Sequence, residues 1–318
     1  MAVTLRAPDD FHVHFRQQPL LGPVVRETAR WFTRALVMPN TVPPVTTPAG
    51  LRSYRDEILA AQAGPAGDTP TGAAPAATGA GPALTPLMTF KVVPEVDPLL
   101  VADFVAAGAV GGKLYPRGVT TNSADGVDEV EPLYPLFEAM QEHGLVLEIH
   151  AESPAAFSLD RESAYLPTIA RIVRRFPRLR IVIEHVSSAA AITALRDLPE
   201  TVAATVTVHH LLLTLDDVIG GELRPHHFCK PVAKRPEDRE AIARAVLSGN
   251  PRVFFGSDSA PHLRGDKESD CGCAGIYTAP VALPLLAEYF EQAGVPLTEA
   301  AAEGAAARAA AHTGAPAP

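Results

Sequence analysis

Two histidines stand one residue apart near the amino terminus, in the stretch from Asp9 to Arg16. Side chains at positions i and i+2 of a β-strand point to the same side. If residues 11–15 are extended, His12 and His14 project together into the space inside the sheet. Two imidazoles so placed can bind one metal ion. The spacing alone leaves open the alternative of two half-buried polar residues at a strand end.

Other potential ligands close apolar runs further along the chain. His150, His185 and Asp258 each end such a run, and Lys113 lies in a Gly-Gly-Lys-Leu-Tyr-Pro segment. Each alone has an ordinary structural explanation, such as a buried histidine that bonds a carbonyl or an aspartate that caps a helix. Their joint occurrence favours a metal site. Imidazole and carboxylate ligands suit Zn²⁺, and a set without cysteine favours a catalytic over a structural zinc site.

Short apolar, β-branched runs that predict strands recur eight times. They cover residues 11–15, 35–38, 84–93, 110–115, 145–150, 179–185, 202–208 and 253–256. The stretches between them with helical periodicity include residues 132–143, 165–176, 189–198 and 236–247. Strands that alternate with helices predict a parallel sheet, and eight such units predict a closed (β/α)8 TIM barrel. A doubly wound open sheet is the alternative, but the first strand lacks the glycine-rich phosphate loop that usually follows in that fold.

Active sites of such barrels lie at the carboxyl-terminal ends of the strands. The barrel therefore predicts that all these potential ligands meet on one rim. They are His12 and His14 from strand one, Lys113 from strand four, His150 from strand five, His185 from strand six and Asp258 from strand eight.

Length and composition favour one globular domain, residues 1–318, with a small-molecule partner. The chain is 47% hydrophobic and carries a formal net charge of -9, without a dense Lys/Arg tract, so neither nucleic acid nor a membrane is an expected partner. The amino terminus lacks a signal-peptide pattern and no apolar run reaches membrane-spanning length, so we expect a cytoplasmic protein. Cys229, Cys271 and Cys273 are interpreted as reduced packing residues.

Two segments differ from the rest in composition. Residues 63–86 consist almost entirely of Ala, Gly, Pro and Thr, which predicts a flexible surface insertion between the second helix and the third strand. Residues 297–312 are alanine-rich and predict a last helix, with a frayed tail at residues 314–318. Neither segment is expected to carry chemistry.

Several motifs together make the chain resemble the dihydroorotases of the amidohydrolase superfamily, specifically the bacterial type II class, essentially from end to end. The motifs are His12-Val13-His14-Phe15-Arg16, Met38-Pro39-Asn40-Thr41, Gly112-Lys113-Leu114-Tyr115-Pro116, Thr120-Thr121-Asn122-Ser123, Glu148-Ile149-His150-Ala151-Glu152, Glu184-His185, Arg224-Pro225-His226, Cys229-Lys230-Pro231, Ser257-Asp258-Ser259-Ala260-Pro261-His262 and Cys271-Gly272-Cys273-Ala274-Gly275. The resemblance implies two zinc ions per subunit, bridged by a carbamate on Lys113 and by a hydroxide. His12, His14, Lys113 and Asp258 would hold one ion, and Lys113, His150 and His185 the other. A carbamate offers two anionic oxygens, which a neutral amine cannot.

The resemblance also implies the substrate contacts. It assigns Arg16, Asn40 and His262 to the substrate carboxylate, Thr120 and Thr121 to a mobile loop, and the backbones near Lys230 and Ala274 to the pyrimidine ring. An arginine fork suits a carboxylate, and Arg16 lies two residues beyond His14 on the predicted strand face. His209 and His210 end the seventh predicted strand and are interpreted as supporting or packing residues.

The implied function is the reversible cyclisation of N-carbamoyl-L-aspartate to L-dihydroorotate, with Asp258 as the proton shuttle. Two alternatives remain. A related cyclic amidohydrolase, such as a hydantoinase or allantoinase, would keep the metal ligands but need not keep the residues that grip a carboxylate. A non-catalytic scaffold homologue would be expected to have lost metal ligands. The resemblance further implies a homodimer.

Overall fold

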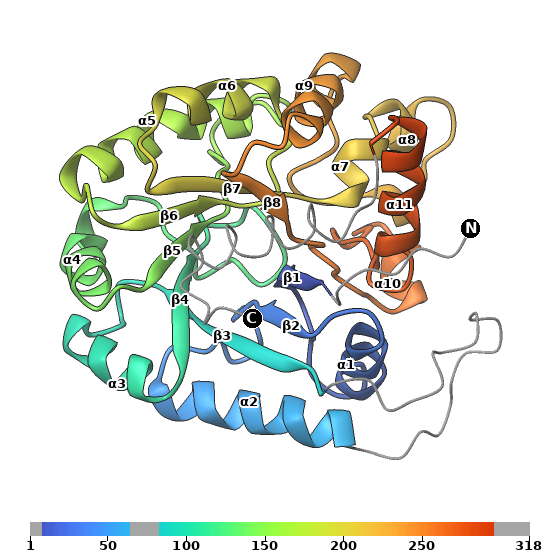
Figure 1. The fold of residues 1–318 in the computed structure, drawn as a ribbon. Helices are drawn as coiled ribbons and strands as arrows, with labels where there is room; N and C mark the ends of the chain where they lie inside the picture. The colour runs from blue at the N-terminus through green and yellow to red at the C-terminus, as the bar shows by residue number, and fades with distance from the viewer. Residues whose placement is uncertain (1–7, 64–82, 296–318) are drawn as a thin grey trace.

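The protein is represented by a computed structural model, which describes residues 8–63 and 83–295. Eight parallel strands follow one another around the sheet in chain order, with helices outside them (Figure 1). The strands are β1 (Asp9–Val13), β2 (Arg34–Val37), β3 (Thr85–Val92), β4 (Ala109–Leu114), β5 (Val146–Ile149), β6 (Arg180–Ile183), β7 (Val202–Val206) and β8 (Val253–Phe255). This arrangement confirms the predicted (β/α)8 barrel.

The segment after β8 brings the last strand back to the first. Asp258 N donates to His12 O over 2.9 Å, and His14 N donates to Ser259 O over 3.0 Å. The buried Asp10 carboxylate on β1 also accepts from the backbone N of Ser257 over 2.8 Å. These bonds tie the carboxyl-terminal ends of β1 and β8 together, which is where the site was predicted.

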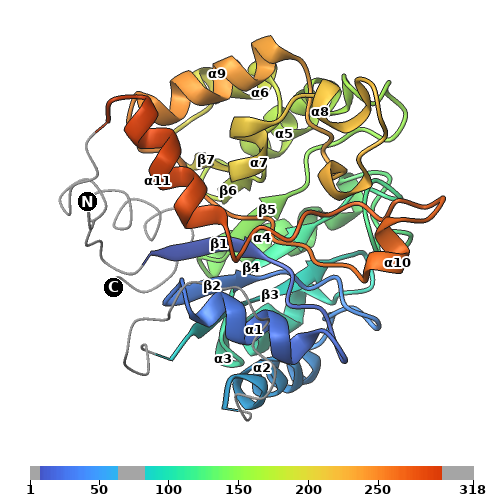
Figure 2. The ribbon, with the colours of Figure 1, turned by 90° about the vertical axis from the view of Figure 1, so that its right-hand side faces the viewer.

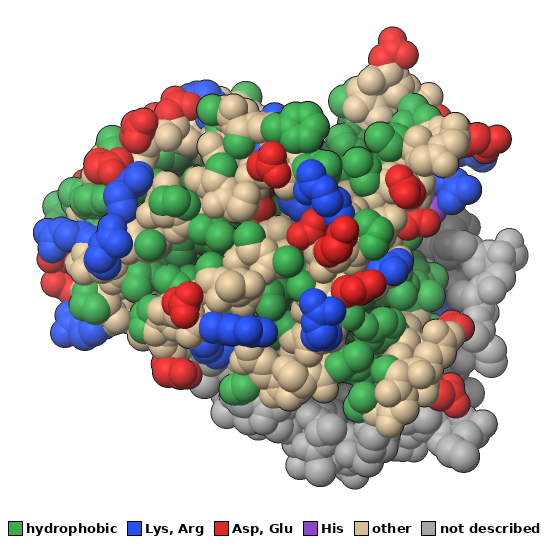
Figure 3. Space-filling model, turned by 90° about the horizontal axis from the view of Figure 1, so that it is seen from above, with side chains coloured by type: hydrophobic (Ala, Val, Ile, Leu, Met, Phe, Trp, Pro, Cys, Tyr) green, Lys and Arg blue, Asp and Glu red, His purple; other side chains and the backbone are tan. Residues whose placement is uncertain are grey.

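Helices surround the barrel, and the short helices among them include several that follow β7 and β8 (Figure 2). They are α1 (Leu21–Ala29), α2 (Pro48–Ala63), α3 (Val101–Ala106), α4 (Tyr134–Glu142), α5 (Arg161–Arg175), α6 (Ala189–Asp197), α7 (Val208–Leu212), α8 (Asp216–Ile219), α9 (Pro236–Leu247), α10 (Arg264–Lys267) and α11 (Ala282–Gln292), with 3-10 turns at Pro98–Leu100, Glu131–Leu133 and Pro225–His227. No helix among the described residues is both long and apolar enough to cross a membrane. Basic and acidic side chains are interspersed on the face seen in Figure 3.

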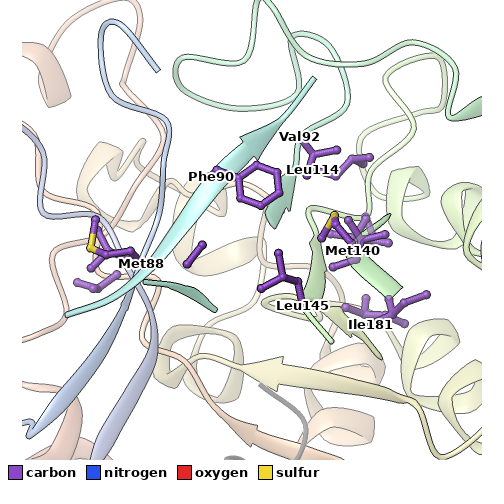
Figure 4. Packing of buried hydrophobic residues seen from close by; sticks show 14 of the residues in the cluster. Met88, Phe90, Val92, Leu114, Met140, Leu145 and Ile181 are labelled. Atoms are coloured by element: carbon purple, nitrogen blue, oxygen red, sulfur yellow. The ribbon is translucent and has the colours of Figure 1, made fainter. Parts of the chain in front are cut away.

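Two apolar clusters account for the packing. The larger one fills the space between the sheet and its helices, where Phe90 of β3 and Met140 of α4 lie close to the strands (Figure 4). The smaller one lies inside the barrel and takes residues from every strand except β4. Its members are Phe11, Leu36, Met38, Leu87, Val146, Val182, Ala203 and Phe254, with Val110 packed against them.

The inside of the barrel turns polar toward the carboxyl-terminal ends of the strands. Since strand side chains alternate, the residue two positions after an inward apolar one also faces inward. On β3 this places Lys91 inside, four residues after Leu87, and on β5 it places Glu148 inside, two residues after Val146. Both are buried. An apolar plug therefore closes one end of the barrel, and ionisable groups gather above it.

Several predicted boundaries shift. The proposed insertion at residues 63–86 is too wide, because Ala63 still ends α2 and Thr85 already begins β3; residues 64–82 lie outside the described part, as do the predicted helix at 297–312 and the tail at 314–318. His209 and His210 do not end a strand but lie on α7, since β7 stops at Val206. Cys271 is exposed rather than packed, whereas Cys229 is buried.

Candidate metal and substrate site

A bulge in β1 sets the direction of the two amino-terminal histidines. The pairing of β1 with β2 shifts register between Asp10 and Val13. A bulge inserts an extra residue and re-aims the side chains that follow. Phe11 can therefore point into the barrel plug, where it packs edge-on against Phe254, while His12 and His14 both reach the rim. His12 and His14 project together, as the i, i+2 spacing predicts, although β1 ends at Val13 rather than at residue 15.

His12, His14 and Asp258 form a compact triangle of ligand atoms. His12 Nε2 and His14 Nε2 are 3.3 Å apart, and Asp258 Oδ1 lies 3.3 Å from the first and 3.2 Å from the second. Ligands about 2.1 Å from a tetrahedral zinc ion stand roughly 3.4 Å from one another. The triangle therefore has the dimensions of one face of a zinc coordination sphere.

A second group of ligand atoms lies beside the triangle. One atom each of His12, Glu184 and His185 falls within a 4.8 Å span, and the rings of His150 and His185 have centroids 4.7 Å apart. Lys113 contacts Glu184. The structure thus brings all six predicted ligands together. It also places Glu184 among them, a residue for which the sequence predicted no role.

Unpartnered buried atoms support a metal at this place. His185 Nδ1 and both carboxylate oxygens of Glu148 are buried without a hydrogen-bond partner among the described residues. Buried polar atoms nearly always have a partner, and an ion or a water is the usual explanation when protein supplies none. The donor set and these orphaned atoms therefore fit a metal centre.

Hydrogen bonds on the far side of two rings define which nitrogen is available to a metal. His14 Nδ1 lies 2.9 Å from Asn40 Oδ1, so it donates there and leaves Nε2 free toward Asp258. His150 Nε2 lies 2.7 Å from Glu152 Oε2, which leaves Nδ1 as the free nitrogen of that ring. Carboxylate or amide partners of this kind orient metal-binding histidines and raise their basicity.

Burial prepares these residues for a cation. Burial lowers the pKa of His12, His14, His150 and His185, so the imidazoles are neutral and hold lone pairs for a metal. Burial also lowers the pKa of Lys113 to about 7.

Asp258 is held as a carboxylate. Burial acts to raise its pKa, but the ion pairs that it forms with His12 and His14 when those rings are protonated at low pH outweigh burial and place the pKa well below its usual range. Its backbone is strained, with φ 45°. Within the described residues, the other non-glycine residues with positive φ are Arg16, Asn122 and His185, and all of them lie at the same end of the barrel. Strained backbone of this kind concentrates at functional sites.

Arg16 reaches the site by a route that differs from the prediction. β1 ends at Val13, and Arg16 adopts φ 61° in the following loop, so it does not continue the strand face. Its Nε donates to Pro261 O over 3.0 Å, and one terminal nitrogen lies 3.1 Å from His262 Nε2. His262 Nε2 is also 2.9 Å from Ala274 O. Arg16, His262 and the Ala274 backbone therefore meet, as predicted.

Asn40 links the predicted metal ligand His14 to the loop that carries Thr120 and Thr121. Besides its bond to His14, it donates from Nδ2 to Thr121 O over 3.1 Å. Thr121 Oγ1 in turn donates to Ala274 O over 3.3 Å. The loop with Thr120 and Thr121 thus lies across the site and touches both of its sides.

A single pocket with an empty volume of about 320 Å³ collects most of the predicted residues. Its wall includes the predicted ligands His12, His14, His150, His185 and Asp258. It also includes Arg16, Asn40, Thr120, Thr121, Lys230 and Ala274. Lys113 is fully buried beneath this wall, and His262 stands behind Arg16.

His209, His210 and Cys229 form a third group with metal-compatible spacing. His210 is already engaged, since Nδ1 lies 2.9 Å from Thr207 Oγ1 and Nε2 lies 3.0 Å from Pro231 O. A ring with both nitrogens bonded has none left for a metal. His210 therefore has a packing role, in agreement with the sequence interpretation.

Sequence reasoning gave no role to Glu184, Glu152 or Lys91. Glu184 and Glu152 stand inside motifs that the sequence offers, next to or two residues from a predicted ligand. Their signal was a carboxylate within two residues of a rim histidine. Lys91 lies on β3, which contributes no predicted ligand, and the sequence around it contains no comparable signal.

A barrel with histidines and a carboxylate gathered on its carboxyl-terminal rim is typical of metal-dependent hydrolases. The family model described as amidohydrolase matches residues 9–310. A dihydroorotase of Azoarcus sp. (strain BH72) is 45% identical over 92% of this chain and 82% of its own. The crystal structure of dihydroorotase from Campylobacter jejuni matches with a TM-score of 0.80 and 37% identity, over 96% of this chain and 83% of its own. The crystal structure of the Saccharomyces cerevisiae dihydroorotase in complex with 5-fluoroorotic acid matches with a TM-score of 0.85 and 34% identity, over 98% of this chain and 85% of its own. The chain belongs to the amidohydrolase family and, within it, to the dihydroorotases.

Proposed function

We propose that the protein is a dihydroorotase, which interconverts N-carbamoyl-L-aspartate and L-dihydroorotate in pyrimidine biosynthesis. The observation that carries the proposal is one pocket with two chemistries. The wall of the pocket holds the His12, His14 and Asp258 triangle and also Arg16, which His262 contacts from behind. A cyclic amide that carries a carboxylate presents one group to the triangle and the other to Arg16.

Two zinc ions per subunit fit the donor set. His12, His14 and Asp258 would hold one, His150 and His185 the other, and a carbamate on Lys113 would bridge them. When bound, the metal pair supplies an activated water and polarises the amide carbonyl. The complete burial of Lys113 favours the neutral amine, which is the form that reacts with CO₂.

Asp258 is assigned the proton transfer. In the hydrolytic direction it takes a proton from the attacking water and passes it to the ring nitrogen that leaves. In the synthetic direction it begins protonated and the same transfers reverse. General acid and base help is needed because an amide is a poor electrophile with a poor leaving group.

Arg16, Asn40 and His262 are assigned to the substrate carboxylate. The Arg16 guanidinium is held at Nε by Pro261 O, so its remaining donors can face a ligand in a fork. Asn40 would have to exchange its bond to Thr121 O for one to substrate. The backbones at Lys230 and Ala274 line the pocket and are assigned to the ring. Thr120 and Thr121 are assigned to closure of the loop over substrate, which excludes water from the reaction.

A hydantoinase or allantoinase activity is the alternative within the enzyme class. Such substrates lack the carboxylate, so Arg16 and His262 would have no anionic group to bind. A scaffold without catalysis is the alternative outside that class, and it would give no reason for an intact set of buried ligands. Neither alternative uses all the residues that line the pocket.

The deciding assay uses purified protein reconstituted with zinc and bicarbonate. We expect loss of dihydroorotate absorbance, formation of N-carbamoyl-aspartate, and much slower turnover of hydantoin and allantoin. Faster turnover of hydantoin or allantoin would move the protein to the alternative activity, and no turnover of any of the three would favour the scaffold.

Three further properties belong to the same proposal. A single domain spanning residues 1–318 predicts one cooperative unfolding transition by calorimetry. A homodimer predicts twice the chain mass in light scattering. A cytoplasmic location predicts recovery with the cytoplasmic fraction when cells are fractionated.

A further inference from the structure

Lys91 is a buried cation that no part of the proposed chemistry uses. It lies near the end of β3, directly beside Lys113 in the register of β3 with β4, and is only 1% exposed. Its Nζ is 5.7 Å from the centroid of the Tyr115 ring. A buried ammonium is costly unless hydrogen bonds and an opposite charge accompany it.

The partners of Lys91 lie on the threonine loop, defined here as residues 118–126. Nζ donates to Asn122 O over 3.0 Å and forms an ion pair with the Asp125 carboxylate. The two ends of this pair differ in burial, because Lys91 lies inside the barrel on a strand whereas the Asp125 side chain is 52% exposed on the loop. A fixed charge inside the barrel therefore holds a charge on the loop.

The residue that Lys91 holds is connected to the rest of the site. Asn122 has φ 54°, and its Nδ2 donates to Asn40 O over 3.0 Å. Asn40 bonds Thr121 O and the His14 ring. Lys91 thus fixes the loop one residue away from Thr121, through bonds that do not pass through any predicted metal ligand.

We propose that Lys91 is a positioning residue that sets the closed position of the threonine loop, with Asp125 as its counter-ion. Opening the loop removes both of its hydrogen-bond acceptors and leaves the ammonium to water alone, so the pair favours closure. The kinetic part of this inference rests on the proposed function, because closure matters to turnover only if Thr120 and Thr121 meet substrate.

Asp125→Asn is the most direct variant, since Asp125 is exposed and its change should not disturb folding. Glu129→Gln is the matched control, because it removes the same charge from an exposed position four residues away. Trypsin cleavage after Arg117, followed by mass spectrometry, reports release of the loop without reference to activity. Dihydroorotate turnover by the zinc-loaded protein gives the second readout.

We expect Asp125→Asn to make this cleavage about fivefold faster and to lower kcat/KM about fivefold. Both changes are on the scale of a partly exposed ion pair. Glu129→Gln should stay within about twofold of the parent protein on the same scale. Lys91→Met should match or exceed Asp125→Asn, and adding Asp125→Asn to it should have little further effect, because the pair is already broken.

The inference is overturned if Asp125→Asn matches Glu129→Gln in both readouts. If Lys91→Met fails to fold, Asp125→Asn still decides the question. A parent protein inactive on dihydroorotate would defeat the proposed function, while the cleavage rates would still test whether Lys91 holds the loop.

Discussion

The predicted metal ligands and the predicted substrate contacts line one pocket but are carried by different parts of the fold. The predicted metal ligands lie on strands or a few residues after strand ends, deep in the barrel mouth, and His12, His150 and His185 are at most 2% exposed. The substrate contacts lie in loops, and they bond to one another across long sequence separations, as Arg16 does with His262.

The difference teaches how each half is fixed. Strand geometry places the metal ligands, and burial keeps water from them, so some of their atoms, such as His185 Nδ1, have no hydrogen-bond partner among the described residues. Hydrogen bonds between loops place the substrate contacts, which are already partnered with each other. Changes in the first half should therefore affect metal content, and changes in the second half should affect affinity and turnover with the metals in place.

Lys113→Ala should have the largest effect. It removes the proposed bridge, so the protein should lose most of its zinc and nearly all turnover, as measured by elemental analysis and dihydroorotate assay. Added short carboxylic acids should restore part of the activity by supplying a bridging carboxylate. Lys234→Ala removes another buried lysine, and as a control it should keep zinc. Two zinc ions and normal turnover in Lys113→Ala would exclude the carbamate.

Asp258→Asn should come next. The amide keeps one ligating oxygen but accepts no proton, so zinc should largely remain while turnover falls by roughly 10²- to 10⁴-fold in both directions. Asp266→Asn, an exposed change in the same segment, should leave both unchanged. Retained zinc with a near-native rate would show that another group moves the proton, and His262 would be the next residue to test.

Arg16→Met tests the predicted substrate contacts, which lie in loops. It should weaken apparent affinity for both substrates by about 10- to 100-fold, the scale of hydrogen bonds to a charged group, without changing zinc content. Arg16→Lys keeps the charge but not the fork, so its apparent affinity should fall between those of the parent protein and Arg16→Met. An unchanged KM in Arg16→Met would return Arg16 to a structural role.

Changing Thr120 and Thr121 together to Ala should have the smallest effect of this series. Loss of both hydroxyls should lower kcat by about tenfold with little change in melting temperature. The same pair changed to Ser keeps the hydroxyls and should recover most of the loss. A large fall in melting temperature with normal kcat in the folded fraction would contradict a role in closure.

The same contrast explains what the sequence could predict. Strand-borne ligands follow from periodicity, because two residues on one strand or two strand ends in one barrel have a fixed relation. That reasoning placed His12, His14, His150, His185 and Asp258 together. It could not foresee the bulge in β1, because alternation alone would not let Phe11 and His12 face the same side.

Loop-borne contacts needed more than periodicity. Arg16 was predicted on a strand face, yet it turns through a positive φ that no local pattern marks. Lys91 and Asp125 are 34 positions apart in the sequence. They become neighbours only when β3 and the threonine loop have folded, so no local pattern predicts the pair. Glu184 was visible in a motif, but its place among the ligands depends on how β6 meets β1 and β4 across the barrel.

The central claim is that the strand-borne residues form a two-zinc centre. A crystal structure of the zinc-loaded protein, with anomalous data at the zinc edge, tests it most directly. The account predicts two anomalous peaks, one among His12, His14 and Asp258 and one beside His150 and His185, with extra density on Lys113 between them. Peaks absent from this rim, or zinc found only at His209, His210 and Cys229, would contradict it.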